Sequence, residues 1–141
     1  MKLYCAGPIR GDRSYVQFVE EIVLLTLKMG HIPLRELTPQ SEEELATDDK
    51  MIYRRDMDWL DQAQALIAEV SAPSLGVGYE IAYALHIREI PVLCLHHRSS
   101  GPLSAMISEN VSELLTLETY EAKEELEEIM RRFLEKCASA I

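Results

Sequence analysis

Two carboxylic acids in the sequence stand where they could act together on a bound sugar. Asp56 shares a predicted helix face with Trp59 and Leu60, three and four residues further on, so its side chain leans toward the interior. Glu80 lies one turn into another predicted helix. A pair of carboxylates can divide glycosidic chemistry between a nucleophile and an acid/base. Taken singly, Asp56 could instead be satisfied by an arginine or by backbone amides, and Glu80 could be a solvated helix residue.

The residues just before Glu80 form an unusual helix start. Ser74 is a natural N-cap, while Gly76 and Gly78 fall in the first turn, where each costs up to about 1 kcal/mol relative to alanine. Helix stability therefore does not select these glycines. A ligand that lies close against the turn would explain them, because the amide groups and the Ser74 hydroxyl would then face its phosphate or sugar oxygens.

A second candidate anion-binding turn follows the first predicted strand and contains Gly7, Pro8, Ile9, Arg10 and Gly11. Its glycines allow close backbone approach, it leads into a helix N-terminus, and arginines can donate charge-assisted hydrogen bonds to an oxyanion. The alternative is a plain strand-to-helix connection with solvated arginines. The pattern is neither GxxxxGK[ST] nor GxGxxG.

Apolar runs alternating with helical patterns must position these turns. The predicted strands are 2–6, 31–34, 65–70, 90–95 and 113–117, and the predicted helices are 14–29, 50–62, 75–87, 103–107 and 121–138. Strands that are apolar throughout and alternate with helices predict an α/β fold: a three-layer α/β/α sandwich around a doubly wound, five-stranded parallel sheet of Rossmann or flavodoxin type. We expect one domain over residues 1–141. In such a sheet, ligands bind beyond the carboxyl ends of the strands.

Composition restricts the classes of partner. The chain has 141 residues, 48% of them hydrophobic, and a net charge of −10. This excludes a disordered chain and disfavours a nucleic acid polymer, so an anionic ligand would need a few local donors. Three widely spaced cysteines favour a reducing cytoplasm. We expect no membrane span, metal site or cofactor, and we interpret His96 and His97 as solvated loop residues.

These motifs resemble the 2'-deoxynucleoside 5'-phosphate N-hydrolases, relatives of the nucleoside 2-deoxyribosyltransferases. The resemblance covers nearly the whole chain and is carried by residues 4–11, by Asp56 with Trp59 and Leu60, by residues 68–80 and by residues 103–107. It implies hydrolysis of the N-glycosidic bond of a deoxynucleoside monophosphate to a free base and 2-deoxyribose 5-phosphate, through a covalent glycosyl-enzyme intermediate.

The resemblance also implies residue roles. Glu80 matches the nucleophile, Asp56 the acid/base and Tyr4 the tyrosine that orients the nucleophile. The implied phosphate site comprises Arg10, Ser74 and the backbone of residues 7–11 and 76–78. The segment Ser104, Ala105 and Met106 matches a family segment whose serine contacts the substrate phosphate bound by the neighbouring subunit. The resemblance therefore implies a homodimer.

The chain departs from the family pattern at specific positions. Pro8 stands where a phosphate-contacting serine is expected, and proline offers neither a hydroxyl nor an N–H, which makes unphosphorylated nucleosides more plausible substrates. A base-pocket histidine is missing from residues 34–37, so the base preference is open. The sequence also leaves open whether the position of Asp56 along its helix brings its carboxyl group to the same end of the sheet as Glu80. The alternatives are a nucleoside 2-deoxyribosyltransferase that exchanges bases and a nucleotide-binding regulatory domain without turnover.

Overall fold

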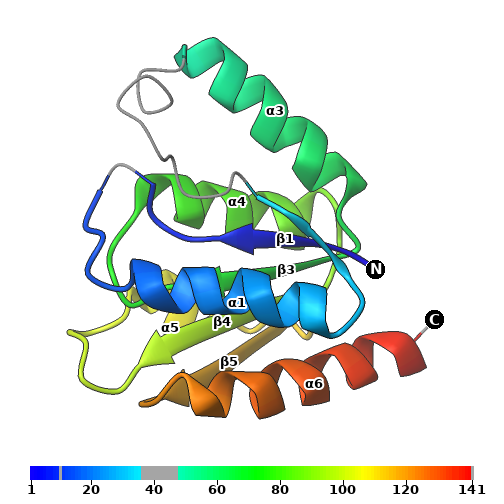
Figure 1. Cartoon of the computed structure of the whole chain (residues 1–141). Coiled ribbons are helices and arrows are strands. Elements are labelled where there is room, and N and C mark those ends of the chain that lie inside the picture. Colours follow the sequence, from blue (N-terminus) through cyan, green and yellow to red (C-terminus); the bar gives the residue numbers. More distant parts are fainter. Residues whose placement is uncertain (10, 36–47, 141) are drawn as a thin grey trace.

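The computed structural model describes residues 1–9, 11–35 and 48–140, and these residues contain one sheet of five parallel strands (Figure 1). The strands are β1 (Lys2–Ala6), β2 (Ile32–Leu34), β3 (Ala65–Glu69), β4 (Val92–His97) and β5 (Leu115–Tyr120), in the order β2-β1-β3-β4-β5. The strand order reverses between β1 and β3, and a ligand crevice is expected beyond their carboxyl ends. The predicted doubly wound parallel sheet is confirmed.

Helices cover both faces of the sheet. On one face lie α1 (Val16–Lys28) and α6 (Glu124–Ser139), and on the other lie α3 (Asp49–Gln62), α4 (Leu75–His86) and the short α5 (Ala105–Ser108). Alternate β1 residues serve the two cores: Leu3 and Cys5 pack toward α1 and α6, and Tyr4 and Ala6 toward α3 and α4. The alternation along β1 therefore places the Tyr4 ring on the α3 and α4 side.

The ends of β4 and β5 extend beyond their predicted limits. His96 and His97 belong to β4 and pair with β5, so the prediction that they are solvated loop residues is wrong. The His97 ring is half-buried, with its centroid 5.2 Å from that of Phe18 and 5.1 Å from that of Tyr120. Imidazole can fill such a position because its ring packs like other aromatic rings while a nitrogen stays within reach of polar groups.

A buried carboxyl group braces the start of the loop from β3 to α4. Glu69 is fully buried and accepts hydrogen bonds from the Tyr120 hydroxyl, at 2.9 Å, and from the Ser71 hydroxyl and backbone N–H. The Ser71 hydroxyl oxygen accepts in turn from the backbone N–H of His97 at 2.8 Å. This network joins the carboxyl ends of β3, β4 and β5, and so anchors the loop that leads to Ser74.

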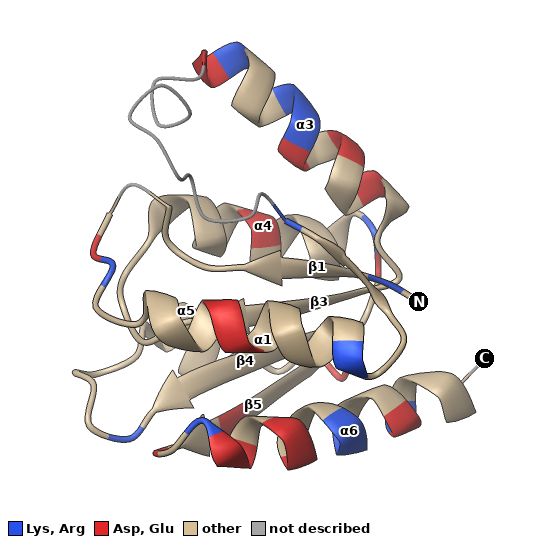
Figure 2. Cartoon of the chain, viewed as in Figure 1, with Lys and Arg blue, Asp and Glu red and all other residues tan. Residues whose placement is uncertain are grey.

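Helix α6 has the solvated charged face that its sequence predicts (Figure 2). Arg131 pairs with Glu128 and with Glu135, at 2.9 Å to the latter, on exposed parts of the helix. The positions predicted to dock on the sheet are buried: Leu126, Ile129, Met130 and Phe133. In the described ranges, no helix combines the length and apolar character needed to cross a bilayer.

Candidate active site

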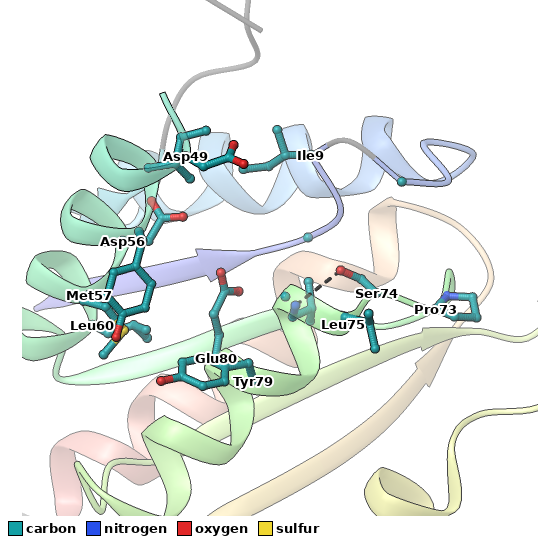
Figure 3. Close-up of a pocket in the computed structure, with 16 residues that line it drawn as sticks. Ile9, Asp49, Asp56, Met57, Leu60, Pro73, Ser74, Leu75, Tyr79 and Glu80 are labelled. Atoms are coloured by element: carbon teal, nitrogen blue, oxygen red, sulfur yellow. Dashed lines mark hydrogen bonds between the residues drawn. The ribbon is translucent and has the colours of Figure 1, made fainter. Parts of the chain in front are cut away.

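A pocket of about 670 Å³ opens between α3, α4 and the segment that follows β1 (Figure 3). It lies at the carboxyl ends of β1 and β3, where the sheet topology predicts a ligand site. The pocket gathers residues that the sequence places far apart, namely Gly7, Ile9, Gly11, Asp56, Ser74, Gly76 and Glu80. Tyr4 lines a smaller adjoining cavity.

Helix α3 presents a regular face to this pocket. Asp49, Ile52, Tyr53, Asp56 and Leu60 recur at spacings of three or four residues, and all line the cavity. Asp56 stands in the middle of α3, and its carboxyl group meets the same pocket as that of Glu80. The structure thus places Asp56 and Glu80 in the lining of one pocket.

The Glu80 carboxyl group points from α4 toward the side of the pocket formed by α3 (Figure 3). The Tyr4 hydroxyl donates a hydrogen bond to Glu80 Oε1 at 2.9 Å. Burial, followed by the charges of Glu80 and Asp56, raises the pKa of Tyr4 far above its usual value. Tyr4 therefore keeps its proton and acts as a donor that orients the Glu80 carboxylate.

Burial also raises the pKa of Glu80 to about 7, because a charged carboxylate is poorly solvated in this position. The hydrogen bond from Tyr4 and the positive charge of Arg35 oppose this shift, while the negative charge of Asp56 adds to it. Near neutral pH, Glu80 is thus present both as the acid and as the carboxylate. A group poised in this way can change protonation state during a reaction.

Asp56 has a different environment from Glu80. Arg55 contacts Asp56 Oδ1 through Nε at 2.9 Å and through Nη2 at 2.8 Å. The Arg55 guanidinium also lies over the Trp59 ring, 4.7 Å from its centroid. A guanidinium at this distance stabilises the ionised form of Asp56. The two carboxyl groups of the pocket therefore differ in their surroundings, as is typical of an acid/base pair with divided roles.

The start of α4 has the predicted cap. Ser74 Oγ accepts a hydrogen bond from the Val77 backbone N–H at 3.3 Å. Gly76 lines the pocket, whereas Gly78 does not. A Cβ at Gly76 would come no closer than 3.9 Å to Ser74 Oγ, and a Cβ at Gly78 would meet nothing within 4 Å. Packing against the described residues thus requires glycine at neither position.

The segment after β1 forms the opposite wall of the pocket. Gly7, Ile9 and Gly11 line it, and Pro8 is buried beside it without lining it. A Cβ at Gly7 would stand 2.6 Å from Val19 Cγ2, so close packing against α1 by itself accounts for this glycine. Arg10, the arginine predicted to hold an anion here, lies outside the described residues.

The segment around Ser104 does not reach the pocket of its own chain. Ser104 caps α5 by accepting a hydrogen bond from the Met106 backbone N–H at 3.3 Å. Ser104, Ala105 and Met106 are exposed, and none lines the cavity. Within one chain, the segment around Ser104 is therefore not part of this pocket.

Sequence reasoning missed several residues at the site. Tyr53 and Met57 line the pocket, and the signal that could have found them was the helix periodicity that places them beside Asp56. Tyr79 lines it as the neighbour of Glu80. The sequence interpretation noted Arg35 only as part of a segment without the expected histidine. Its Nη1 donates to the carbonyl oxygens of Cys5, at 3.0 Å, and Gly7, at 3.4 Å.

Comparison with known proteins gives the same classification as the motifs. The chain is 39% identical over 140 residues to a 5-hydroxymethyl-dUMP N-hydrolase of Esox lucius, with 94% of this chain and 95% of that protein covered. It is 34% identical over 139 residues to the 5-hydroxymethyl-dUMP N-hydrolase of Mus musculus, with 94% and 79% covered. The resemblance recognised from the motifs is confirmed.

A solved structure shares the fold. The CMP N-glycosidase BcmB of Clostridium botulinum superposes with a TM-score of 0.66 over 93% of this chain and 99% of its own, at 13% sequence identity. The family match covers residues 3–117, from β1 through the first residues of β5, and so includes the whole of β2, β3 and β4. On this match, and on the relatives that align along nearly the whole chain, the protein belongs to the nucleoside 2-deoxyribosyltransferase family.

Proposed function

We propose that the protein hydrolyses the N-glycosidic bond of 2'-deoxynucleoside 5'-monophosphates, and that Glu80 is the nucleophile. One observation carries the proposal: the Tyr4 hydroxyl donates a hydrogen bond to Glu80 at 2.9 Å, in a cavity that Asp56 also lines. N-hydrolysis of a nucleotide is also the activity for which the similar proteins from Esox lucius and Mus musculus are named.

The proposed chemistry has two steps with balanced atoms. In the first, a Glu80 carboxylate oxygen bonds to C1' of the sugar, the C1'–N bond breaks, and its electron pair leaves with the base, which takes a proton from Asp56. In the second, water attacks C1' and gives a proton to Asp56, and the bond to Glu80 breaks. The sum is nucleotide plus water giving free base plus 2-deoxyribose 5-phosphate.

The proposed roles require one protonation state of the two carboxyl groups, and it is the reverse of the state that the burial of Glu80 and the Arg55 contact of Asp56 favour before a substrate binds. The reactive form needs Glu80 ionised and Asp56 protonated, so the pair must hold one proton. Once Asp56 has given its proton to the departing base, the adjacent Arg55 guanidinium stabilises the carboxylate that forms. A 2-deoxy sugar lacks the electron-withdrawing 2'-hydroxyl, which makes its oxocarbenium-like transition state easier to reach.

The start of α4 is the proposed phosphate site. Ser74 and Gly76 lie at the N-terminal end of a helix of 12 residues, where unpaired amide groups and the helix dipole favour an anion. Because packing does not require Gly76, a ligand that approaches the backbone is the better account of it. Gly7 and Gly11 line the opposite wall of the same pocket.

We also place the protein in the cytoplasm as a homodimer in which Ser104 contacts the phosphate bound by the other subunit. Three buried cysteines outside any disulfide suit a reducing compartment. The side chains of Leu75 and Met106 are 97% and 79% exposed, which suits apolar surface that a second subunit covers. The compartment can be checked by fractionation, and the subunit number by light scattering.

The activity is tested by incubating the protein with each deoxynucleoside monophosphate and measuring free base and 2-deoxyribose 5-phosphate by chromatography. We expect both products from the wild type and a loss of at least about 1,000-fold in kcat for Glu80→Gln, which removes the nucleophile. Asp56→Asn should lower kcat about 100-fold or more through loss of acid/base catalysis. Asp58→Asn is the matched control, because Asp58 is exposed on the same helix.

Two outcomes would contradict the proposal. Turnover of unphosphorylated deoxynucleosides alone, and only with an acceptor base, would identify a base-exchanging transferase. Nucleotide binding that raises the melting temperature, with no base released by the wild type, would identify a binding domain without turnover.

A further inference from the structure

Arg35 places a positive charge in a cavity that the proposed catalytic residues also line, from a segment of the chain that supplies none of them. It follows β2, the edge strand, and its guanidinium reaches the carboxyl end of β1. There Nη1 donates to the carbonyl oxygens of Cys5, at 3.0 Å, and of Gly7, at 3.4 Å. These uncharged acceptors hold the guanidinium in place without cancelling its charge.

The groups around Arg35 include both members of the carboxylate pair. Arg35 lines the small cavity of about 10 Å³ together with Tyr4 of β1, Arg55 and Asp56 of α3, and Glu80 of α4. Cys5 also lines this cavity, but its buried thiol lies on the α1 side of the sheet, 3.8 Å from Thr26 Oγ1. In this cavity, Asp56 and Glu80 are negatively charged when they are ionised, and Arg35 and Arg55 supply the opposite charge. Arg55 forms an ion pair with Asp56, with Nη2 2.8 Å from Oδ1.

The electrostatic balance at Glu80 therefore depends on Arg35. Burial of Glu80 and the charge of Asp56 both disfavour the Glu80 carboxylate, whereas the charge of Arg35 and the Tyr4 hydroxyl favour it. Burial also lowers the pKa of Arg35 itself, although an arginine remains protonated at neutral pH. Without this charge, the nucleophile would spend more of its time protonated and unreactive.

We propose that Arg35 is a positioning residue for the reaction, held by the Cys5 and Gly7 carbonyl groups so that its charge keeps Glu80 available as a carboxylate beside Asp56. The inference rests on the proposed function for its catalytic meaning. Arg35 also joins the end of β1, which carries Tyr4, to the Gly7 end of the pocket wall. The Arg35 side chain thus supplies a positive charge to the site and also holds the end of β1 and the Gly7 segment together.

The direct test follows the ionisation of Glu80 without any substrate. In protein labelled with ¹³C at the glutamate carboxyl carbons, the Glu80 signal is assigned from its loss in Glu80→Gln, and its titration midpoint is measured by NMR. We expect Arg35→Gln to raise this midpoint by about one pH unit, because a positive charge is lost nearby. Arg35→Lys, which keeps the charge, should move it by less than half as much.

Arg88→Gln is the matched control. Arg88 is also half-buried and also donates to a backbone carbonyl, that of Leu60 at 2.9 Å, but it lines neither cavity. Its loss should leave the Glu80 midpoint unchanged. If Arg35→Gln does not fold, Arg35→Met is the second neutral variant. An unchanged midpoint in a folded neutral variant, or an equal shift in Arg88→Gln, overturns the proposal.

The kinetic test uses the pH dependence of kcat/KM for a deoxynucleoside monophosphate. Only the form with Glu80 ionised and Asp56 protonated reacts, and because the Asp56 requirement is common to both proteins, the ratio of variant to wild-type kcat/KM reports the ionisation of Glu80. A Glu80 midpoint one unit higher lowers kcat/KM relative to the wild type about tenfold at pH 6 and hardly at all at pH 9. A loss of equal size at every pH would mean a purely structural role and overturn the proposal. If the wild type releases no base, the proposed function fails, while the NMR titration still decides the effect of Arg35 on Glu80.

Discussion

The environment of Glu80 places stability and activity in opposition at a single residue. Burial raises the pKa of this carboxyl group to about 7, so its ionisation is unfavourable in the folded protein and favourable in the unfolded chain. The Tyr4 hydroxyl and the Arg35 charge reduce this penalty without removing it. If Glu80 is the proposed nucleophile, its reactive carboxylate form carries this penalty at neutral pH.

Replacing Glu80 by glutamine should therefore stabilise the protein in a pH-dependent way. Between the usual glutamate pKa near 4.5 and about pH 7 the unfolded chain loses a proton that the folded protein retains, so wild-type stability falls over this range and stays lower above it. Glutamine does not ionise. At pH 8 we expect Glu80→Gln to raise the free energy of unfolding in urea by roughly 2–4 kcal/mol.

The gain should shrink toward pH 4.5, where wild-type Glu80 is protonated in the folded state. Glu124→Gln, at an exposed position on α6, is the control and should change stability by less than about 0.5 kcal/mol. Equal stability of Glu80→Gln and the wild type at pH 8 would contradict a buried, unfavourably ionised carboxyl group.

At the scale of the element, α4 begins with a turn that gives up helix stability. Ser74 supplies a good cap, yet Gly76 and Gly78 follow it in positions where the chain leaves space for a Cβ. Only Gly76 faces the pocket. The two glycines therefore form a matched pair that separates the effect on the helix from the effect on a ligand.

Alanine at either position should stabilise the helix by about 0.5–1 kcal/mol, measured by urea unfolding. Gly76→Ala should also raise KM for a deoxynucleoside monophosphate about tenfold or more, because the methyl group enters the pocket next to Ser74. Gly78→Ala should leave KM within about twofold of wild type. If both variants bind substrate as well as the wild type, the α4 turn does not hold the phosphate.

At the scale of the whole molecule, a chain with net charge −10 is proposed to bind an anion. Some of the negative charge lies away from the pocket, as on α6, whose exposed face carries more acids than bases (Figure 2). Local donors at the start of α4 can bind one phosphate in spite of the net charge, whereas a polyanion would meet general repulsion. The proposed second subunit adds the donor Ser104.

The proposed sharing of Ser104 between subunits can be tested with a mixed dimer. Ser104→Ala should raise KM about tenfold through loss of a phosphate hydrogen bond, and Glu80→Gln should be inactive. Mixing the two denatured variants and refolding them together gives hybrids in which one site has both Glu80 and the partner's Ser104. We expect these hybrids to recover a fraction of sites with wild-type KM.

Ser112→Ala provides the control in the same mixing experiment, because Ser112 lies beyond α5 and lines neither cavity. Hybrids of Ser112→Ala and Glu80→Gln subunits should show a single KM, equal to that of the wild type, at every mixing ratio. A mixture of Ser104→Ala and Glu80→Gln that keeps only the raised KM would show that Ser104 does not serve a neighbouring site.

The sequence by itself determined the parallel sheet, the cap at Ser74 and the carboxylate candidates Asp56 and Glu80. These depend on local signals: apolar runs, helical spacing and cap chemistry act over a few residues. The same spacing argument, carried one turn along α3, would have included Tyr53.

Only the tertiary structure decided which of these residues meet. Asp56 and Glu80 lie on different helices, and their common pocket follows from how α3 and α4 pack on the sheet. The contact of Arg35 with the β1 carbonyl groups and the enclosure of His97 by aromatic rings are likewise long-range contacts. No local pattern encodes them, because burial and the electrostatic field at a residue depend on chain segments distant in sequence.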